Sequence, residues 1–347
     1  MTSAPAQLAS FVSMVRLRRT SPEDPGWTRR RAGKGFTYLD EHGQRLAEEQ
    51  VQRIRGLVIP PAWRDVWITP YDNGHLQCVG TDDAGRRQYL YHPAWREQRD
   101  AEKFDRMLEF GRALTKARES VVTDLGREGM PLERACGAAV RLLDLGYFRI
   151  GNDVYADENG SFGLTTLERR HVRKRQDMLV FTFTGKSKVD HRIEITDPVV
   201  IEAIEVMRRR RGEDPRLLSY KERRSWRSVL PELVNDYVRA VTGLEASAKD
   251  FRTWHATVLA AAALATTTEP GESQASRKRA ISSAMKEVSS FLGNTPTLAR
   301  SSYVDPRVIA AYESGQTIQG VTRREYDTPD QRQAALERAT LRLLKDS

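Results

Sequence analysis

The sequence predicts an α+β protein, in which a small N-terminal β-sheet domain precedes a mostly α-helical domain that contains a β-hairpin. Two patterns carry this prediction. Short apolar runs separated by turn residues fill the first hundred residues, and apolar residues at helical spacing follow from residue 101. The length of 347 residues suits two domains, each large enough to bury its own core. We place the boundary near residue 97, which gives domains 1–97 and 98–347.

The N-terminal domain is predicted from strands that alternate with turns rich in Asp, Asn and Gly. Because side chains alternate along a strand, Tyr89 and Tyr91 share one face and Gln88 lies on the other. Such a face could bind a partner or pack on its own domain, and the sequence leaves both readings open. In chain order the strands and turns are Val66–Ile68, Asp72–Gly74, Leu76–Val79, Asp83–Gly85 and Gln88–Tyr91.

The second domain begins with core helices, predicted between Ala101 and Leu145. Alternating apolar residues from 178 to 196 then predict a β element with its hairpin turn at Gly185–Lys188. Helices return after Pro198, and one apolar stripe ends just before Gly243, a residue type favoured after helices. Residues 266–276 are rich in Thr, Glu, Ser, Gly and Pro, which predicts a mobile surface loop.

The composition is basic, with 56 Lys and Arg residues against 47 Asp and Glu residues and a net charge of +9. Such a surface attracts nucleic-acid phosphates, although ribosomal and membrane-surface proteins share this bias. Cys78 and Cys136 are too few for a disulfide framework or a cysteine zinc site. No apolar run reaches the roughly 18 residues needed to cross a bilayer. We therefore expect a soluble, cytoplasmic protein without a resident metal.

Tyr303 is the candidate nucleophile, because a phenol oxygen can form a covalent phosphodiester. Gly293 can end one helix, Thr295 can cap the next, and Pro296 suits its first position. Tyr303 then follows about two turns later. A single tyrosine at a helix end is more often a packing or surface residue, so the interpretation of Tyr303 depends on the other candidate residues.

Two arginines stand in settings that suit phosphate binding. Arg252 follows Asp250, which we expect to cap an apolar helix with Arg252 in its first turn. A guanidinium there can bind two phosphate oxygens through its planar fork. Arg149 lies between Phe148 and Ile150, where it needs an anionic partner. For each arginine the alternative is an ion pair with a carboxylate of the protein.

Lys186 lies at the tip of the predicted hairpin, where its ammonium can reach a groove and donate a proton. Lys188 is the obvious competitor for this role. Gly185–Ser187 resembles a phosphate-binding loop, but Val180 stands where that motif needs glycine, so we exclude nucleotide binding. His171 and His255 lack a second ligand at metal-like spacing, and we assign them no catalytic role.

Together these segments resemble the type IB DNA topoisomerases, in the small poxvirus and bacterial branch. The resemblance spans residues 58–312, with Gly85–Tyr91 similar to a DNA-contacting strand of the family. One departure is Asn294, which stands nine residues before Tyr303 where viral and eukaryotic members have histidine. An amide can still donate to a phosphate oxygen. The segments that carry the resemblance are Phe148–Asn152, Gly185–Lys186, Lys249–Thr253 and Gly293–Tyr303.

The resemblance implies an enzyme that relaxes supercoiled duplex DNA through a 3′-phosphotyrosyl intermediate, strand rotation and religation, without ATP, metal or other cofactor. It implies a clamp, with residues 1–97 as the DNA-clamp domain and 98–347 as the catalytic domain of a nucleoid-associated monomer. The roles it implies are Tyr303 as nucleophile, Arg149, Arg252 and Asn294 as phosphate ligands, Lys186 as acid with Lys249 assisting, and Arg86, Gln88, Tyr89 and Tyr91 as DNA contacts.

Two other functions fit parts of the same pattern. A tyrosine recombinase uses a similar Arg, Lys and Tyr set, but the β-rich N-terminal region does not resemble its helical core-binding domain. A DNA-binding protein without catalytic activity could keep the fold, yet the set of candidate residues is complete except for the change at Asn294. We therefore favour the topoisomerase.

Overall fold

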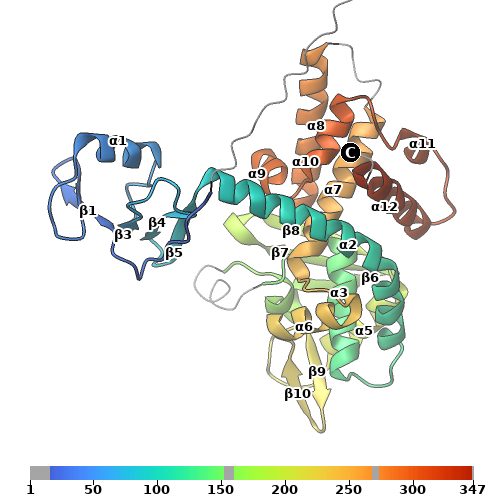
Figure 1. Cartoon of the computed structure of the whole chain (residues 1–347). Helices are drawn as coiled ribbons and strands as arrows, with labels where there is room; N and C mark the ends of the chain where they lie inside the picture. The colour runs from blue at the N-terminus through green and yellow to red at the C-terminus, as the bar shows by residue number, and fades with distance from the viewer. Residues whose placement is uncertain (1–15, 152–159, 268–272, 346–347) are drawn as a thin grey trace, which may run out of the picture. The chain divides into compact units, whose positions relative to one another are not determined.

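The computed structural model describes residues 16–151, 160–267 and 273–345. Its internal contacts divide the chain into two compact units, Met1–Lys103 and Phe104–Ser347, which we describe separately. The first is built on a β-sheet and the second is mostly helical (Figure 1), so the predicted α+β class is confirmed. The domain limits 1–97 and 98–347 stay a prediction. In the described part of the chain, no helix is both long and apolar enough to span a membrane.

The first unit contains an antiparallel five-stranded sheet in the order β2-β1-β3-β4-β5. Its core is small, with Trp27, Ile54, Val66, Ile68 and Cys78 buried together. The three predicted strands correspond to β3, β4 and β5. The sequence analysis missed β1 and β2, because β1 carries three consecutive arginines and lacks apolar alternation. The elements are β1 (Trp27–Ala32), β2 (Gly35–Leu39), α1 (Glu48–Gly56), β3 (Arg64–Ile68), β4 (Leu76–Thr81) and β5 (Arg87–Tyr91).

Strand β5 presents the predicted tyrosine face. Tyr89 and Tyr91 are 45% and 37% exposed, and their rings stack with centroids 6.2 Å apart. Leu90 points the other way and packs on the small core. The tyrosines therefore do not form the packed face of their own sheet, which was the alternative left open by the sequence.

The second unit places a three-stranded sheet, ordered β6-β7-β8, among helices that share one large apolar core. Helix α2 (Pro93–Leu125) leads into it. Within this unit α8 and α10 lie at one end and the β9–β10 hairpin at the other (Figure 1). The remaining elements are α3 (Leu132–Gly146), β6 (Val172–Arg175), β7 (Met178–Thr184), β8 (Asp190–Ile195), α5 (Pro198–Arg209), β9 (Ser219–Glu222), β10 (Ser225–Ser228), α6 (Pro231–Thr242), α7 (Ala248–Thr266), α8 (Gln274–Leu292), α9 (Pro296–Ser302), α10 (Pro306–Glu313), α11 (Gln319–Thr322) and α12 (Pro329–Lys345), with short 3-10 turns at Leu164–Thr166, Arg169–His171 and Lys186–Lys188.

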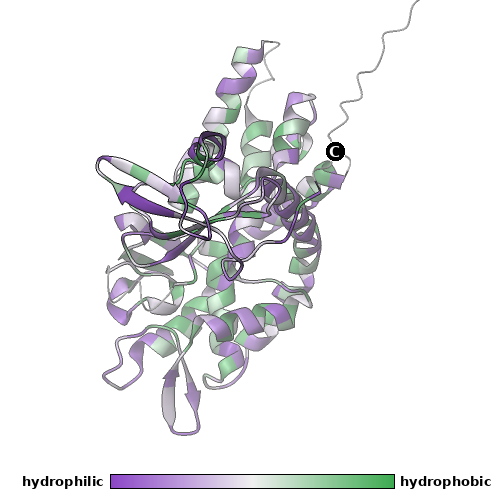
Figure 2. Ribbon diagram, turned by 60° about the vertical axis from the view of Figure 1, so that its left-hand side comes forward, coloured by the Kyte–Doolittle hydropathy of each residue, from purple (hydrophilic) through white to green (hydrophobic). Residues whose placement is uncertain are grey.

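Helix α7 is the central element of this core. Phe251 and Trp254 are buried, and the Phe251 ring meets Phe110 edge-to-face at 5.0 Å. A Cβ on Gly111 would lie 2.6 Å from the Trp254 ring, so only glycine lets α2 approach so closely. Apolar residues accordingly follow the central helices, whereas the β9–β10 hairpin is hydrophilic (Figure 2).

The helix that carries Arg252 begins earlier than predicted. Ser247, rather than Asp250, is the N-cap of α7. Asp250 lies in the first turn, and its carboxylate accepts hydrogen bonds from Ser247 N at 2.8 Å and Ser247 Oγ at 3.0 Å. Arg252 therefore lies in the second turn of the helix. The prediction was wrong because Asp at either position can satisfy free N–H groups, and only the fold selects between them.

The predicted ends of the next helices are confirmed. Gly293 ends α8 with a left-handed backbone, at φ 58°. Thr295 caps α9 by accepting from Leu298 N, and Pro296 is its first residue. Helix α8 begins at Gln274, inside the loop predicted for 266–276, and residues 268–272 of that prediction lie outside the described residues.

Candidate active site

Tyr303 occupies the C-terminal end of α9 and is 8% exposed. Its backbone N donates to Ala299 O at 3.1 Å, and its carbonyl accepts from Thr257 Oγ1 at 3.3 Å. Because Thr257 also accepts a hydrogen bond from Asp305 N, the central helix α7 holds the backbone at Tyr303 and just after it. Its position is therefore fixed by the core of the unit.

Arg252 reaches the same place from α7 and is 4% exposed. Its guanidinium donates to Tyr147 O and, at 2.6 Å, to Leu292 O, the last residue of α8. The guanidinium carbon lies 5.5 Å from the centre of the Tyr303 ring. These bonds use two of the guanidinium nitrogens, and Nε is buried without a partner.

Arg149 follows the C-terminal end of α3. Its Nη2 donates to Gly293 O at 3.2 Å, so it meets the same end of α8 as Arg252. A close contact between two glycines supports this segment, because a Cβ on Gly163 would lie 2.5 Å from Gly151 Cα. Neither arginine pairs with a carboxylate in the described part of the chain, so the structure does not support the ion-pair alternative there.

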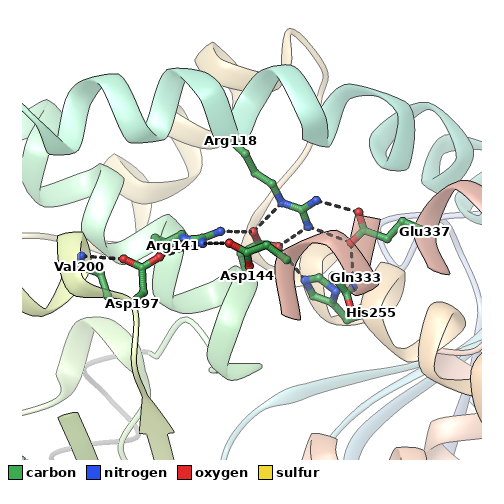
Figure 3. A network of polar contacts seen from close by, with 9 residues as sticks. Arg118, Arg141, Asp144, Asp197, Val200, His255, Gln333 and Glu337 are labelled. Atoms are coloured by element: carbon green, nitrogen blue, oxygen red, sulfur yellow. Dashed lines mark hydrogen bonds and ion pairs between the residues drawn. The ribbon is translucent and has the colours of Figure 1, made fainter. Parts of the chain in front are cut away.

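A network of buried charged side chains connects the neighbouring helices (Figure 3). His255, one turn after Arg252, places its Nε2 3.0 Å from Asp144 Oδ1 on α3. The His255 ring also packs edge-to-face on Tyr147 at 5.2 Å, the residue whose carbonyl accepts from Arg252. His255 thus supports the position of Arg252 through Tyr147.

Lys186 lies on the turn between β7 and β8, where Ser187 and Lys188 both adopt positive φ. Its side chain is exposed and lines a cavity of about 580 Å³. Tyr303, Arg149, Asn294 and Lys249 line the same cavity, whereas Lys188 is not among its lining residues. Arg252 lines a neighbouring cavity of about 370 Å³, which shares Arg149 with the first.

Asn294 has a buried side-chain amide whose Nδ2 and Oδ1 both lack a partner among the described residues. Leaving a buried polar group without a hydrogen bond costs about 1–3 kcal/mol. An amide left in this state beside Tyr303 is therefore suited to a ligand that completes its bonding. Its Nδ2 needs a hydrogen-bond acceptor, such as a phosphate oxygen, whereas its Oδ1 needs a donor.

The electrostatics of the cavity favour an anion. Burial would raise the pKa of Tyr303, but the charges of Arg252 and Arg149 outweigh it, and the net pKa is lowered. Burial, together with Arg149, lowers the pKa of Arg252 to about 10. Within the described residues, no three His, Cys, Asp or Glu side chains gather where they could hold a metal ion. The cavity thus presents cations around a phenol, in an arrangement that suits a phosphodiester.

Comparison with known proteins agrees with this geometry. Residues 92–324, more than half of the chain, match the family model of the eukaryotic DNA topoisomerase I catalytic core. The chain belongs to the type IB DNA topoisomerase family. Residues 35–82 of the topoisomerase also match the N-terminal domain of bacterial DNA topoisomerase IB. This assignment confirms the resemblance seen in the sequence and decides against the tyrosine recombinase.

Several relatives of the chain are named as DNA topoisomerases. DNA topoisomerase 1B of Acanthamoeba polyphaga mimivirus is 27% identical over 297 residues, which cover 83% of this chain and 88% of the viral protein. The vaccinia virus (strain Copenhagen) DNA topoisomerase 1B is 26% identical over 116 residues, 33% of this chain and 37% of that protein. DNA topoisomerase 1 of Schizosaccharomyces pombe is 30% identical over 162 residues, 46% of this chain and 19% of that protein.

The predicted DNA contacts of the topoisomerase lie around the β4–β5 turn. Arg86 forms an ion pair with Asp82 at 2.7 Å, and Gln88 donates to the same carboxylate at 2.9 Å. Both side chains therefore have a polar partner within the chain.

Sequence reasoning missed two residues that shape this site in the topoisomerase. Thr257 holds the backbone at Tyr303 and just after it, and His191 contacts the glycines that precede Lys186 and Asn294. The sequence does contain a signal for His191, because strand alternation places its imidazole on the apolar face shared with Ile193 and Ile195. Thr257 left no comparable signal, since its contacts come from a segment 46 residues away.

Proposed function

We propose that this topoisomerase relaxes supercoiled duplex DNA by cutting and rejoining one strand through Tyr303. The phenol loses its proton, and its oxygen attacks the scissile phosphorus. The bond from phosphorus to the 5′ oxygen breaks as the bond to tyrosine forms. The products are a 3′-phosphotyrosyl enzyme and a strand that ends in a free 5′-hydroxyl. Religation reverses these steps after the strand has rotated.

The remaining candidate residues of the two neighbouring cavities take the other roles. Arg149 and Arg252 stabilise the charge that develops on the phosphate oxygens, and Asn294 donates to a non-bridging oxygen. Lys186 gives a proton to the leaving 5′ oxygen, with Lys249 assisting from the same cavity wall. Since the phosphotyrosyl bond conserves the energy of the broken bond, we propose that neither ATP nor a metal ion is needed.

One observation carries this proposal. Tyr303 lies beside two guanidiniums without carboxylate partners and an amide without any partner, all within the described residues. A structural ion-pair cluster would neutralise its arginines, whereas a phosphodiester would use all three groups together.

The N-terminal unit supplies further DNA contacts in this proposal. Tyr89 and Tyr91 offer a stacked aromatic pair to a groove, and Arg86 and Gln88 flank it. Phosphate contacts dominate the affinity of proteins for duplex DNA, so binding weakens steeply with salt. We propose that the enzyme acts as a monomer that closes around one duplex.

The test is relaxation of negatively supercoiled plasmid in EDTA without ATP, followed by denaturant trapping and mapping of the adduct. We expect relaxation by the wild type, with DNA attached to Tyr303 through a 3′-phosphate. Tyr303→Phe should bind DNA without cutting it, and Tyr220→Phe on β9 serves as the matched control with wild-type activity. Relaxation by Tyr303→Phe, or an adduct on another residue, would contradict the proposal.

A further inference from the structure

His191 lies on β8 and joins two turns of the candidate site. The ring touches the glycine before Lys186, because a Cβ on Gly185 would lie 2.6 Å from His191 Cδ2. It also touches the glycine before Asn294, because a Cβ on Gly293 would lie 2.4 Å from His191 Cε1. Since neither glycine could carry a side chain here, the imidazole is the spacer between the two turns.

The other face of the spacer is also fixed. The His191 ring stacks on Phe183, its partner across the β7–β8 pair, with centroids 5.2 Å apart and planes inclined by 21°. Phe183 in turn stacks on Phe148 at 5.9 Å. Phe148 is buried and directly precedes Arg149. The imidazole therefore belongs to a rigid aromatic stack that begins at the hydrophobic core.

The end of α8 has supports that do not involve His191. Arg149 donates to Gly293 O and Arg252 donates to Leu292 O. The turn that carries Lys186 is held in another way, because Thr184 O just before it accepts from Phe162 N at 2.8 Å and two further bonds close the turn itself. Gly185 N donates to Val189 O at 2.7 Å and Lys188 N to Gly185 O at 3.1 Å, and both bonds lie within the turn. Contact with His191 thus connects this turn to the rest of the site.

Burial and the charges around the ring both favour the neutral form of His191. His191 shares the smaller cavity with Arg149 and Arg252. Burial is the largest cause that lowers the pKa of His191, and the two arginines lower it further, while Asp190 opposes them. A neutral imidazole can pack between two glycines beside a guanidinium pair, whereas an imidazolium would repel that pair.

We infer that His191 is a positioning residue for DNA cleavage, which holds the turn carrying Lys186 at a fixed distance from the Gly293 end of α8. This inference rests on the proposed function, in which Lys186 protonates the leaving 5′ oxygen. Loss of the ring lets the turn move, so proton donation suffers while Tyr303 and the two arginines stay in place. Misplacing a catalytic group by about 1 Å can cost about 100-fold in rate.

The test compares single-turnover cleavage of two DNA substrates, one ordinary and one with a 5′-bridging sulfur at the scissile phosphate. A thiolate leaves without protonation, so this substrate bypasses the acid. We expect His191→Ala to cut the ordinary substrate about 10-fold to 100-fold more slowly, and the sulfur substrate within about 3-fold of the wild-type rate. His191→Phe, which keeps an uncharged ring in the stack, should recover most of the ordinary rate.

Two further variants distinguish a failure of the inference about His191 from a failure of the proposed function. Ile193→Ala removes a side chain from the same face of β8, one step farther from Lys186, and should slow both substrates equally if it slows either. Lys186→Ala must itself be rescued by sulfur, otherwise the acid role fails and the inference fails with it. If Lys186→Ala is rescued but His191→Ala is slow on both substrates, the inference is wrong and the proposed function stands.

Discussion

Arg118 on α2 is bound to Glu337 on α12 by two parallel hydrogen bonds, Nη1 to Oε2 at 2.7 Å and Nη2 to Oε1 at 2.8 Å, although 219 residues separate them. The same guanidinium also binds both oxygens of Asp144 on α3, at 2.8 and 2.9 Å. One arginine thus joins three helices of the catalytic unit, and Asp144 extends the connection to His255 beside Arg252 (Figure 3).

Glu337→Gln should lower the free energy of unfolding by about 1–3 kcal/mol, because Arg118 loses one of its two buried counter-charges but keeps Asp144. The measurement is urea denaturation at neutral pH, followed by circular dichroism. Glu325→Gln changes an exposed carboxylate in the same way and should move the midpoint only slightly. Equal shifts for the two variants would show that the Arg118 network does not stabilise the unit.

Stability should fall in acid partly because of Asp144. Burial alone would raise the pKa of Asp144, but Arg118 and His255 outweigh it and hold this pKa well below its usual range. A carboxyl with a lowered folded-state pKa stabilises the protein above its unfolded pKa of about 4. That contribution is lost as the pH falls toward the folded-state value. Between about pH 5 and pH 3, the free energy of unfolding should therefore fall less for Asp144→Asn than for the wild type, as measured by denaturant titrations. A parallel loss in both proteins would contradict this role.

Asn294→Ala should slow single-turnover cleavage by about 100-fold, the usual effect of removing one donor from a developing oxyanion. Asn294→His should retain most of the rate, because an imidazole also carries an N–H group. Asn294→Asp has nearly the same shape but adds a negative charge beside the phosphate, and it should be at least as slow as the alanine variant. A fully active Asn294→Asp enzyme would remove this residue from phosphate binding.

Replacing both Tyr89 and Tyr91 with alanine should weaken binding to duplex DNA by at least about 10-fold, since exposed aromatic residues often dominate interfaces. Cleavage at saturating DNA should stay close to the wild-type rate, because both residues belong to the N-terminal unit. Tyr71→Ala provides the control, as Tyr71 is an exposed tyrosine of the same unit. Binding by fluorescence anisotropy at several salt concentrations would measure these affinities. An equal loss for Tyr71→Ala would point to a general effect of exposed tyrosines.

Features that depend on near neighbours in the chain could be predicted without the structure. The Gly293, Thr295 and Pro296 pattern predicted where α8 ends and α9 begins, because glycine, cap and proline preferences act within one turn. Alternation along β5 placed Tyr89 and Tyr91 on one face for the same reason. Even there, local rules failed where two choices were equally good, as with Ser247 and Asp250 at the start of α7.

Which distant residues meet could not be predicted from local patterns, because it depends on how the segments pack. Arg149, Lys186, Arg252 and Tyr303 come from four separate segments, and their approach depends on the packing of α7, α8 and the β7–β8 pair. The spacing role of His191 arises from two glycines far apart in the sequence. The Arg118 network is equally invisible to local patterns, because each charge looks exposed until the fold removes its water and supplies its partner.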